Sequence, residues 1–208
     1  MAQPTIALAI TGASGAQYGL RLLEQLIAAK CRVYVMVSKP AQVVFGLELD
    51  LDIPSRPLDM QRWFSERYGA AEGQLQVFSS EQWTAPIASG SNAADAMVIC
   101  PCTAATSAAV AQGLSRSLIE RAADVMLKER RQLLIVLRET PLSSIHLENL
   151  LRLSNAGATI MPAAPGFYNK PESVDELVDF MVARIMDHLR LDNRLSPRWG
   201  ANADLGCS

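Results

Sequence analysis

The amino-acid sequence predicts a single α/β domain with a largely parallel sheet and helices on both faces. Two observations carry this prediction. Short apolar runs of strand length alternate with longer segments of helical periodicity, a succession typical of parallel sheets. The 208 residues contain no internal repeat or linker, and they suffice for one substantial hydrophobic core. We therefore predict one domain over residues 1–191 and a tail over residues 192–208 that lacks periodicity.

The individual elements follow from periodicity and from residues that start or stop helices. The segments predicted as strands are 6–10, 32–37, 75–78, 96–100, 133–137 and 158–161. The segments predicted as helices are 16–26, 40–49, 60–68, the alanine-rich stretch opened by 101–106, 118–131, 143–154 and 174–189. The last helix has the clearest signals, because Ser173 and Glu176 have capping-box spacing and Val174 opens an apolar stripe.

Composition excludes several classes of protein. Half of the residues are hydrophobic and the formal net charge is −2, which argues against disorder and against nucleic-acid binding. The longest apolar runs, such as Leu133–Leu137, are too short to cross a bilayer. No basic region precedes the first apolar run, so we expect no secretory signal and a cytoplasmic location.

The cysteines and histidines do not suggest a metal site. Cysteines occur at positions 31, 100, 102 and 207, and the spacing of Cys100 and Cys102 is not that of zinc or thioredoxin motifs. The histidines are His146 and His188, too few to complete a ligand set. We expect reduced, buried cysteines and no metal.

The turn after the first strand is a candidate ligand site. Gly12 and Gly15 allow close backbone approach, and the first amides of the following helix lack partners within the helix. Such a turn suits an anion, usually a phosphate. The glycine spacing differs from the dinucleotide fingerprint, so a mononucleotide is favoured over NAD.

The other strand ends extend this site. In an open parallel sheet, ligands bind beyond the carboxyl ends of the strands. The segments at those ends are Thr11–Ser14, Ser38–Lys39, Pro101–Thr103, Arg138–Glu139 and Pro165–Tyr168. Together they offer amides, hydroxyls, a guanidinium, a carboxylate and a phenol, which suits a phosphate-bearing ligand beside an acid or base. Taken singly, each residue also has a structural interpretation: Ser14, Thr103 and Thr106 as helix caps, the charged groups as solvated side chains.

Several motifs together resemble the flavin prenyltransferase (UbiX) family, in order from about Thr5 to Trp199. The matching segments are Thr11–Gly15, Ser38–Lys39, Pro101–Thr106, Glu120–Asp124, Leu127–Arg131, Arg138–Pro141 and Pro165–Tyr168. Two positions depart from the family pattern. Thr103 stands where the family usually has serine, and Leu49 follows Glu48 where the family usually has threonine.

The resemblance implies a flavodoxin-like or Rossmann-like fold that binds FMN. It implies transfer of a dimethylallyl group from dimethylallyl monophosphate to N5 and C6 of the flavin, without a metal. The product, prenylated FMN, would serve UbiD-type decarboxylases, often in ubiquinone biosynthesis. Family members usually assemble as dodecamers with sites at subunit contacts, so we expect a homo-oligomer whose sites are shared between copies.

The resemblance also assigns expected roles to residues. The expected FMN-binding residues are Gly12, Ala13, Ser14, Ser38, Thr103, Ala104, Ala105, Thr106 and Arg138. The residues expected around the dimethylallyl phosphate are Arg121, Lys128, Arg138, Tyr168, Arg184 and Trp199. The residues expected to act in catalysis are Ser14, Glu48, Lys128, Glu139 and Tyr168, with Glu139 in proton transfer. Cations and a phenol can stabilise a departing phosphate, and an aromatic face favours an allylic cation.

Two other functions remain open at this point. One is an FMN-dependent cysteine decarboxylase of the same fold, against which the absence of a histidine in the early helices counts. The other is a non-catalytic flavin carrier, which would leave Lys128, Arg138, Glu139 and Tyr168 without a joint purpose.

Overall fold

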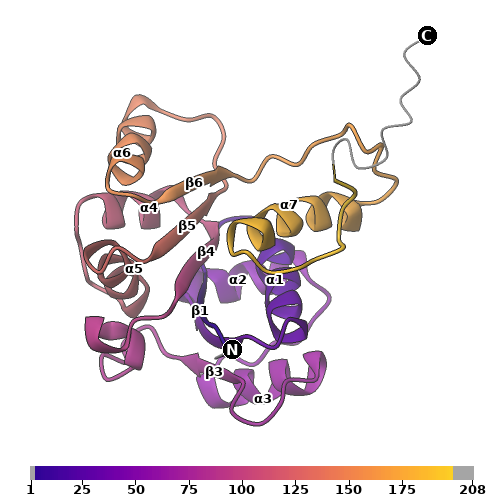
Figure 1. The fold of residues 1–208 in the computed structure, drawn as a ribbon, viewed down its shortest axis with the longest axis horizontal. Coiled ribbons are helices and arrows are strands. Elements are labelled where there is room, and N and C mark those ends of the chain that lie inside the picture. The colour runs from indigo at the N-terminus through magenta and orange to yellow at the C-terminus, as the bar shows by residue number, and fades with distance from the viewer. Residues whose placement is uncertain (1–2, 199–208) are drawn as a thin grey trace.

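The computed structural model describes residues 3–198 and has a six-stranded sheet with helices on both faces, as predicted (Figure 1). The strands are β1 Thr5–Ile10, β2 Arg32–Val37, β3 Leu75–Phe78, β4 Ala96–Cys102, β5 Gln132–Leu137 and β6 Thr159–Pro162. The helices are α1 Ala16–Ala28, α2 Lys39–Glu48, α3 Pro57–Tyr68, α4 Ala104–Ala111, α5 Leu118–Lys128, α6 Ser144–Asn155 and α7 Val174–His188. Two short 3₁₀ turns, η1 Pro86–Ala88 and η2 Gly90–Asn92, precede β4.

The strand order is β3-β2-β1-β4-β5-β6, and every neighbouring pair is parallel. Of the two related forms expected from the sequence, this order is the Rossmann-like one. The chain leaves β1 first toward β2 and β3, and later returns to β1's other side with β4. The order therefore reverses between β1 and β4, and a crevice opens at their carboxyl ends, where ligands of such sheets bind.

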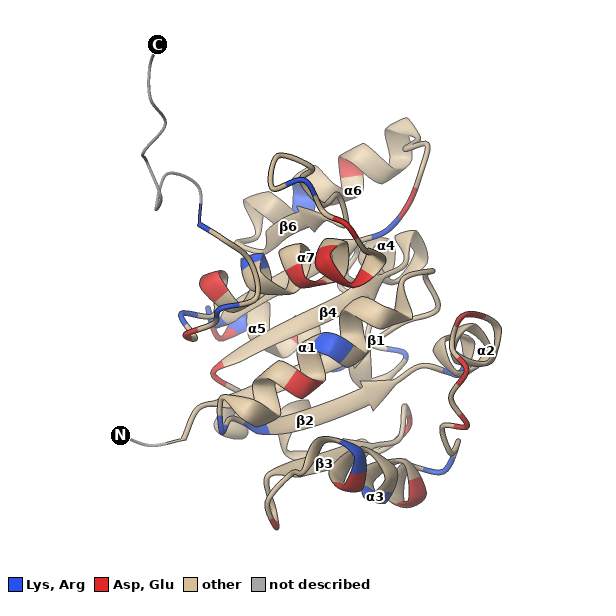
Figure 2. Ribbon diagram, turned by 90° about the vertical axis from the view of Figure 1, so that its right-hand side faces the viewer, with Lys and Arg blue, Asp and Glu red and all other residues tan. Residues whose placement is uncertain are grey.

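The core has two layers, one on each face of the sheet. Leu8 and Ile10 of β1 face a layer closed by α1, α2, α3 and α7. Ala7 and Ala9 point the other way, into a layer closed by α4, α5 and α6. Figure 2 shows α1 and α7 lying across the first face, where the Arg21 guanidinium holds the Asp179 carboxylate at 2.7 Å. Helices α5 and α7 thus cover opposite faces.

The elements differ from the sequence-based prediction mainly at their ends. Strand β4 continues to Cys102 because Thr11 N–H donates to Pro101 O and Cys102 still pairs with Leu137. Helix α5 stops at Lys128 because Arg130 takes a left-handed φ of 56° and the Arg131 N–H returns to Met126 O. Helix α3 starts earlier than predicted, with Pro57 in its first turn.

Two further expectations concern α7 and the chain that follows it. Val174, placed in the apolar stripe of this helix, is 70% exposed because it lies in the first turn, beyond the edge of the core. The described part of the predicted tail, 192–198, lies along α7: the Asn193 amide and the Arg198 guanidinium both contact the Asp187 carboxylate, at 3.1 and 3.2 Å. Within residues 3–198, no helix combines the length and the apolar character that crossing a membrane requires.

Candidate functional site

The crevice between β1 and β4 is held together by Thr11. Its hydroxyl donates to Pro101 O at 2.8 Å and accepts from Thr103 N–H at 2.9 Å. The side chain is 2% exposed, so both bonds are shielded from water. Thr11 thereby fixes the position of Thr103, the N-cap of α4. Sequence reasoning placed this residue in the turn without a role, because its partners lie about ninety positions away.

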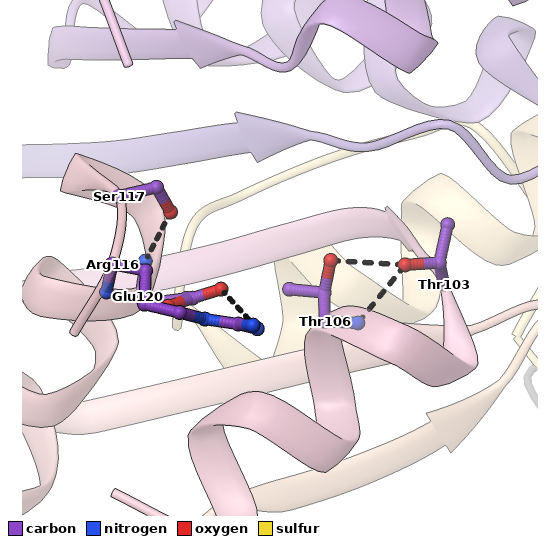
Figure 3. A network of polar contacts seen from close by, with 5 residues as sticks. All are labelled: Thr103, Thr106, Arg116, Ser117 and Glu120. Atoms are coloured by element: carbon purple, nitrogen blue, oxygen red, sulfur yellow. Dashed lines mark hydrogen bonds and ion pairs between the residues drawn. The ribbon is translucent and has the colours of Figure 1, made fainter. Parts of the chain in front are cut away.

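A cavity of about 430 Å³ opens at this crevice, and we refer to it as the Thr103 cavity. Five of the residues expected to bind FMN line it: Gly12, Ser38, Thr103, Ala105 and Thr106. Its other lining residues, which were not among those expected to bind FMN, include Thr11, Lys39, Pro40, Glu81, Arg116, Ser117 and Glu120. Figure 3 shows Thr103 and Thr106 on one side and Arg116, Ser117 and Glu120 on the other.

Three helix N-termini meet at the Thr103 cavity. The N-caps of α2, α4 and α5 are Ser38, Thr103 and Ser117, and all three line the cavity. Each hydroxyl accepts from the N–H three residues later, at 3.1, 3.1 and 3.3 Å respectively. The earlier N–H groups of each first turn have no partner within their helix, and each helix dipole is positive at this end. In α2 only Lys39 offers such an N–H because Pro40 has none, and in α5 the Leu118 N–H donates to Ser80 O at 2.8 Å. The cavity is therefore suited to an anion such as a phosphate.

The first turn of α1, by contrast, already holds an anion of the chain itself. The Glu48 carboxylate, at the end of α2, accepts from Gly15 N–H at 2.9 Å and from Ala16 N–H at 3.1 Å. These amides are therefore not available to a ligand phosphate, which corrects the expectation drawn from the first turn. The helix N-termini that line the Thr103 cavity and suit a phosphate are those of α2, α4 and α5.

The glycines of that first turn serve backbone geometry. A Cβ on Gly12 would lie 2.4 Å from the Cβ of Pro40, so glycine is needed for the close approach of α2. Gly15 has a left-handed φ of 96°, which glycine adopts without strain. Both residues thus bring the Glu48 carboxylate and the α1 N-terminus together.

Glu48 forms a polar cluster with Ser14 and Arg138. Burial alone would raise the pKa of Glu48, but the contacts with Ser14 and with the Gly15 and Ala16 amides, together with the Arg138 charge, lower it. Glu48 is therefore ionised at neutral pH. The Nε of Arg138 is buried and has no hydrogen-bond partner among the described residues, an arrangement that leaves a donor for an anionic or carbonyl ligand group.

Glu139 follows directly at the end of β5. Its Oε1 accepts from Thr140 N–H at 3.2 Å, so one carboxylate oxygen is oriented by the backbone. The residue that follows Arg138 thus supplies a carboxylate at the end of β5.

Tyr168 and Arg184 come together at a second cavity, of about 540 Å³. The Tyr168 ring packs edge-on against Phe180 with centroids 5.6 Å apart, and Arg184 Nη1 lies 3.1 Å from Asp187 Oδ2. Arg184 is in the last turns of α7, next to His188, whose carbonyl accepts from the side chain of Gln132 at the start of β5. This group therefore lies on the α7 face and extends toward the amino edge of the sheet. Trp199, expected to join it, lies outside the described residues.

Arg121 and Lys128 lie on α5 and therefore on the opposite face. Arg121 donates from Nε to Ala88 O at 3.0 Å and pairs with Asp124 at 2.8 Å, while Lys128 pairs with Glu129. Lys128 ends α5 just before β5 begins, near the amino edge of the sheet. The described chain thus brings five of the nine residues expected to bind FMN together at one cavity but does not bring Lys128 to Tyr168 or Arg184.

The buried thiols are not reactive groups. Cys31, Cys100 and Cys102 are free and buried, and burial raises the pKa of Cys31 to about 11 and of Cys102 to about 12. Both thiols are therefore protonated at neutral pH and behave as small apolar residues, as expected. Cys207 lies outside the described residues. Residues 3–198 hold no group of three or more His, Cys, Asp or Glu side chains that could bind a metal.

Comparison with known proteins adds an independent finding. A family model described as "Flavoprotein" matches residues 1–186. The chain is 57% identical to the flavin prenyltransferase UbiX of Pseudomonas aeruginosa over 195 residues, which cover 94% of this chain and 93% of that protein. It is similar in structure to AnUbiX (PadA1), solved with FMN and dimethylallyl pyrophosphate, with 39% identity, a TM-score of 0.85, and 95% and 98% of the two chains covered. It is also similar to a dodecameric FMN-dependent UbiX-like decarboxylase from Escherichia coli O157:H7, with 36% identity, a TM-score of 0.82, and coverage of 94% and 98%.

Proposed function

The chain belongs to the flavin prenyltransferase family of flavoproteins, and from this premise we propose that it joins a dimethylallyl group to FMN. The donor is dimethylallyl monophosphate, new bonds form at N5 and C6 of reduced FMN, and inorganic phosphate leaves. One set of observations carries the proposal: three helix N-termini line the Thr103 cavity, and the buried Nε of Arg138, whose charge acts on Glu48, has no hydrogen-bond partner among the described residues. That arrangement offers separate places for a phosphate and for the polar edge of a flavin.

The Thr103 cavity would bind the phosphate of FMN. Ser38 and the first turn of α4, Thr103–Thr106, supply amides and hydroxyls, and the helix dipoles favour a dianion. The flavin ring would extend toward Gly12, Ala13 and Ser14, where Arg138 can donate to it. Threonine at position 103 keeps the capping hydroxyl, so this departure from the family pattern preserves the cap.

The carboxylates of Glu48 and Glu139 would have different tasks. Glu48 is ionised and its Oε2 accepts two backbone N–H groups, so it serves as a fixed acceptor that positions Ser14 against the flavin. Glu139 has a looser environment, with one bond to Thr140 N–H. We therefore assign proton transfer to Glu139 and orientation of Ser14 to Glu48.

The donor phosphate would be bound by residues from more than one copy of the chain. Breaking the allylic C–O bond requires stabilisation of the departing phosphate, for which Arg121, Lys128, Arg138, Tyr168 and Arg184 supply positive charge and donors. Because α5 and α7 cover opposite faces, Lys128 and Arg184 would meet only across a subunit contact. This supports a homo-oligomer, and a dodecamer by analogy with the E. coli relative.

The tail would complete the donor end. The Asn169 amide donates to Ser196 Oγ at 3.1 Å and Arg198 contacts Asp187, so residues 192–198 run beside the Tyr168–Arg184 group. Trp199 follows directly, and we assign its ring to the face of the allylic cation. In this assignment residues 1–191 form the FMN-binding domain and 192–208 a tail that docks near the site.

The deciding experiment is incubation of the purified protein with reduced FMN and dimethylallyl monophosphate. Mass spectrometry should show a flavin heavier by one C5H8 unit. Bound but unchanged FMN would indicate a flavin carrier, and decarboxylation of a cysteinyl peptide would indicate a cysteine decarboxylase. Dimethylallyl diphosphate in a parallel reaction identifies the preferred donor. The product's recipient would be a UbiD-type decarboxylase, with both proteins in the cytoplasm.

A further inference from the structure

Arg116 and Glu120 form an ion pair at the wall of the Thr103 cavity, in front of the first turn of α5 (Figure 3). The two side chains differ in exposure: Arg116 is 69% exposed and Glu120 only 12%. The carboxylate is therefore part of the cavity wall, whereas the guanidinium extends from it into solvent. A carboxylate in the wall of a cavity that suits a phosphate is an electrostatic conflict unless a cation accompanies it.

The carboxylate is held by two kinds of contact that differ in strength. Its Oε2 accepts from the backbone N–H of Arg116 at 2.7 Å, a short charge-assisted bond. The guanidinium lies farther away, with Nη2 at 3.3 Å from Oε1 and Nε at 3.5 Å from Oε2. Because the guanidinium is largely in solvent and its contacts are long, the side-chain pair is weak. The Arg116 side chain can therefore leave while its backbone keeps Glu120 in place.

Lys39 and Glu81, which also line the cavity, form a second ion pair. Lys39 Nζ lies 4.0 Å from Glu81 Oε1, and both side chains are largely exposed. The cavity thus has two cations, each loosely paired with a carboxylate, around the N-caps Ser38, Thr103 and Ser117. A bound phosphate offers a guanidinium two parallel bonds and a higher charge than one carboxylate.

We propose that Arg116 is a specificity residue for the phosphate of FMN, exchanging its contact with Glu120 for one with the phosphate when the flavin binds. The exchange favours FMN over riboflavin, which lacks the phosphate. The Glu120 carboxylate repels a phosphate that Arg116 does not contact. The preference for FMN over riboflavin therefore depends on Arg116. The inference rests on the proposed function, because it takes FMN as the flavin that occupies the cavity.

The test is flavin binding measured by fluorescence titration, with FMN and riboflavin in parallel. Arg116→Ala should weaken FMN binding about tenfold and leave riboflavin unchanged. Glu120→Gln keeps the acceptor for the Arg116 N–H but removes the charge, and should tighten FMN about threefold. Arg62→Ala is the matched control, because Arg62 is 71% exposed and pairs with Asp59 on α3. It should change neither affinity.

Three outcomes would overturn the inference. One is FMN affinity unchanged in Arg116→Ala, another is an equal loss for FMN and riboflavin, and the third is weaker FMN binding in Glu120→Gln. Failure of the proposed function looks different: the wild-type protein would then bind FMN but leave it unprenylated, or bind no flavin at all. Circular-dichroism melting curves separate a folding defect from a binding defect in each variant.

Discussion

The two ends of the candidate site are built in different ways. At the flavin end, Ser38, Thr103 and Ser117 cap three helices around one cavity, and Thr11 ties β1 to β4 beneath it. All of these contacts form within one chain. At the donor end, Lys128 is on α5, whereas Tyr168 and Arg184 are beside or on α7, across the sheet. One chain carries these groups but does not assemble them.

This difference reflects the physical origin of each end. Helix N-termini follow directly from the alternation of strands and helices, because each helix that starts at the carboxyl edge directs the positive end of its dipole there. The positions of long cationic side chains do not follow from the strand–helix alternation, and such side chains can lie anywhere on the surface. We infer that the fold alone supplies affinity for a flavin phosphate, whereas catalysis depends on assembly of the oligomer.

The largest expected effect concerns Glu139, which follows β5. Glu139→Gln keeps the acceptor for the Thr140 N–H but cannot transfer a proton, so prenylation should slow about a thousandfold. FMN affinity should change little, because the Thr103 cavity is intact. Single-turnover prenylation and fluorescence titration measure the two quantities, with Glu72→Gln, an exposed site, as the control. Equal losses in rate and affinity would show that Glu139 only maintains structure.

The next effect tests whether the donor end is shared between copies. Lys128→Ala and Arg184→Ala should each lower prenylation about a hundredfold, because each removes a charge from the departing phosphate. Co-expression of the two variants should restore about a quarter of the wild-type rate, since one site in four would then draw Lys128 from an Arg184→Ala copy and Arg184 from a Lys128→Ala copy. The rate of the mixed, co-purified oligomer is the measurement. If mixing restores nothing, both residues act within one chain and the donor end is not shared between copies.

The sequence predicted the fold and the flavin end better than the contacts within them. The six strands and the helices between them were predicted because their periodicity is local, and Ser38 and Thr103 were found because they follow strands directly. The Glu48 carboxylate at the α1 N-terminus could not be predicted, because a free helix N-terminus and an occupied one have the same local sequence. The same holds for Thr11, Arg116 and Glu120, whose importance arises only where separate segments meet.

A smaller effect is expected from pH, through Glu48. Its pKa is lowered in the folded chain, so its ionised form stabilises the fold above its usual unfolded pKa of about 4.3, and this contribution is lost as pH falls through the lower, folded value. Glu48→Gln should lower the free energy of unfolding at pH 7 by about 1 kcal/mol. Wild type and variant should converge in stability in acid.

Urea unfolding at neutral and acid pH measures this convergence. Glu66→Gln, on the exposed side of α3, is the control and should show neither the loss nor the convergence. A Glu48→Gln variant that is as stable as wild type at pH 7 would mean that the contacts with Gly15 and Ala16 do not stabilise the α1 N-terminus.

The smallest effect separates capping from ligand binding. Ser117 and Ser143 are both N-caps whose hydroxyls accept from the third residue of their helix, at 3.3 and 3.2 Å. Each change to alanine should cost about 1 kcal/mol of stability, because a backbone N–H loses its acceptor. Only Ser117 lines the Thr103 cavity, so only Ser117→Ala should also weaken FMN, about threefold, while riboflavin binding stays the same. If Ser143→Ala weakened FMN equally, the flavin end would depend on general stability and not on the helix N-termini at the cavity.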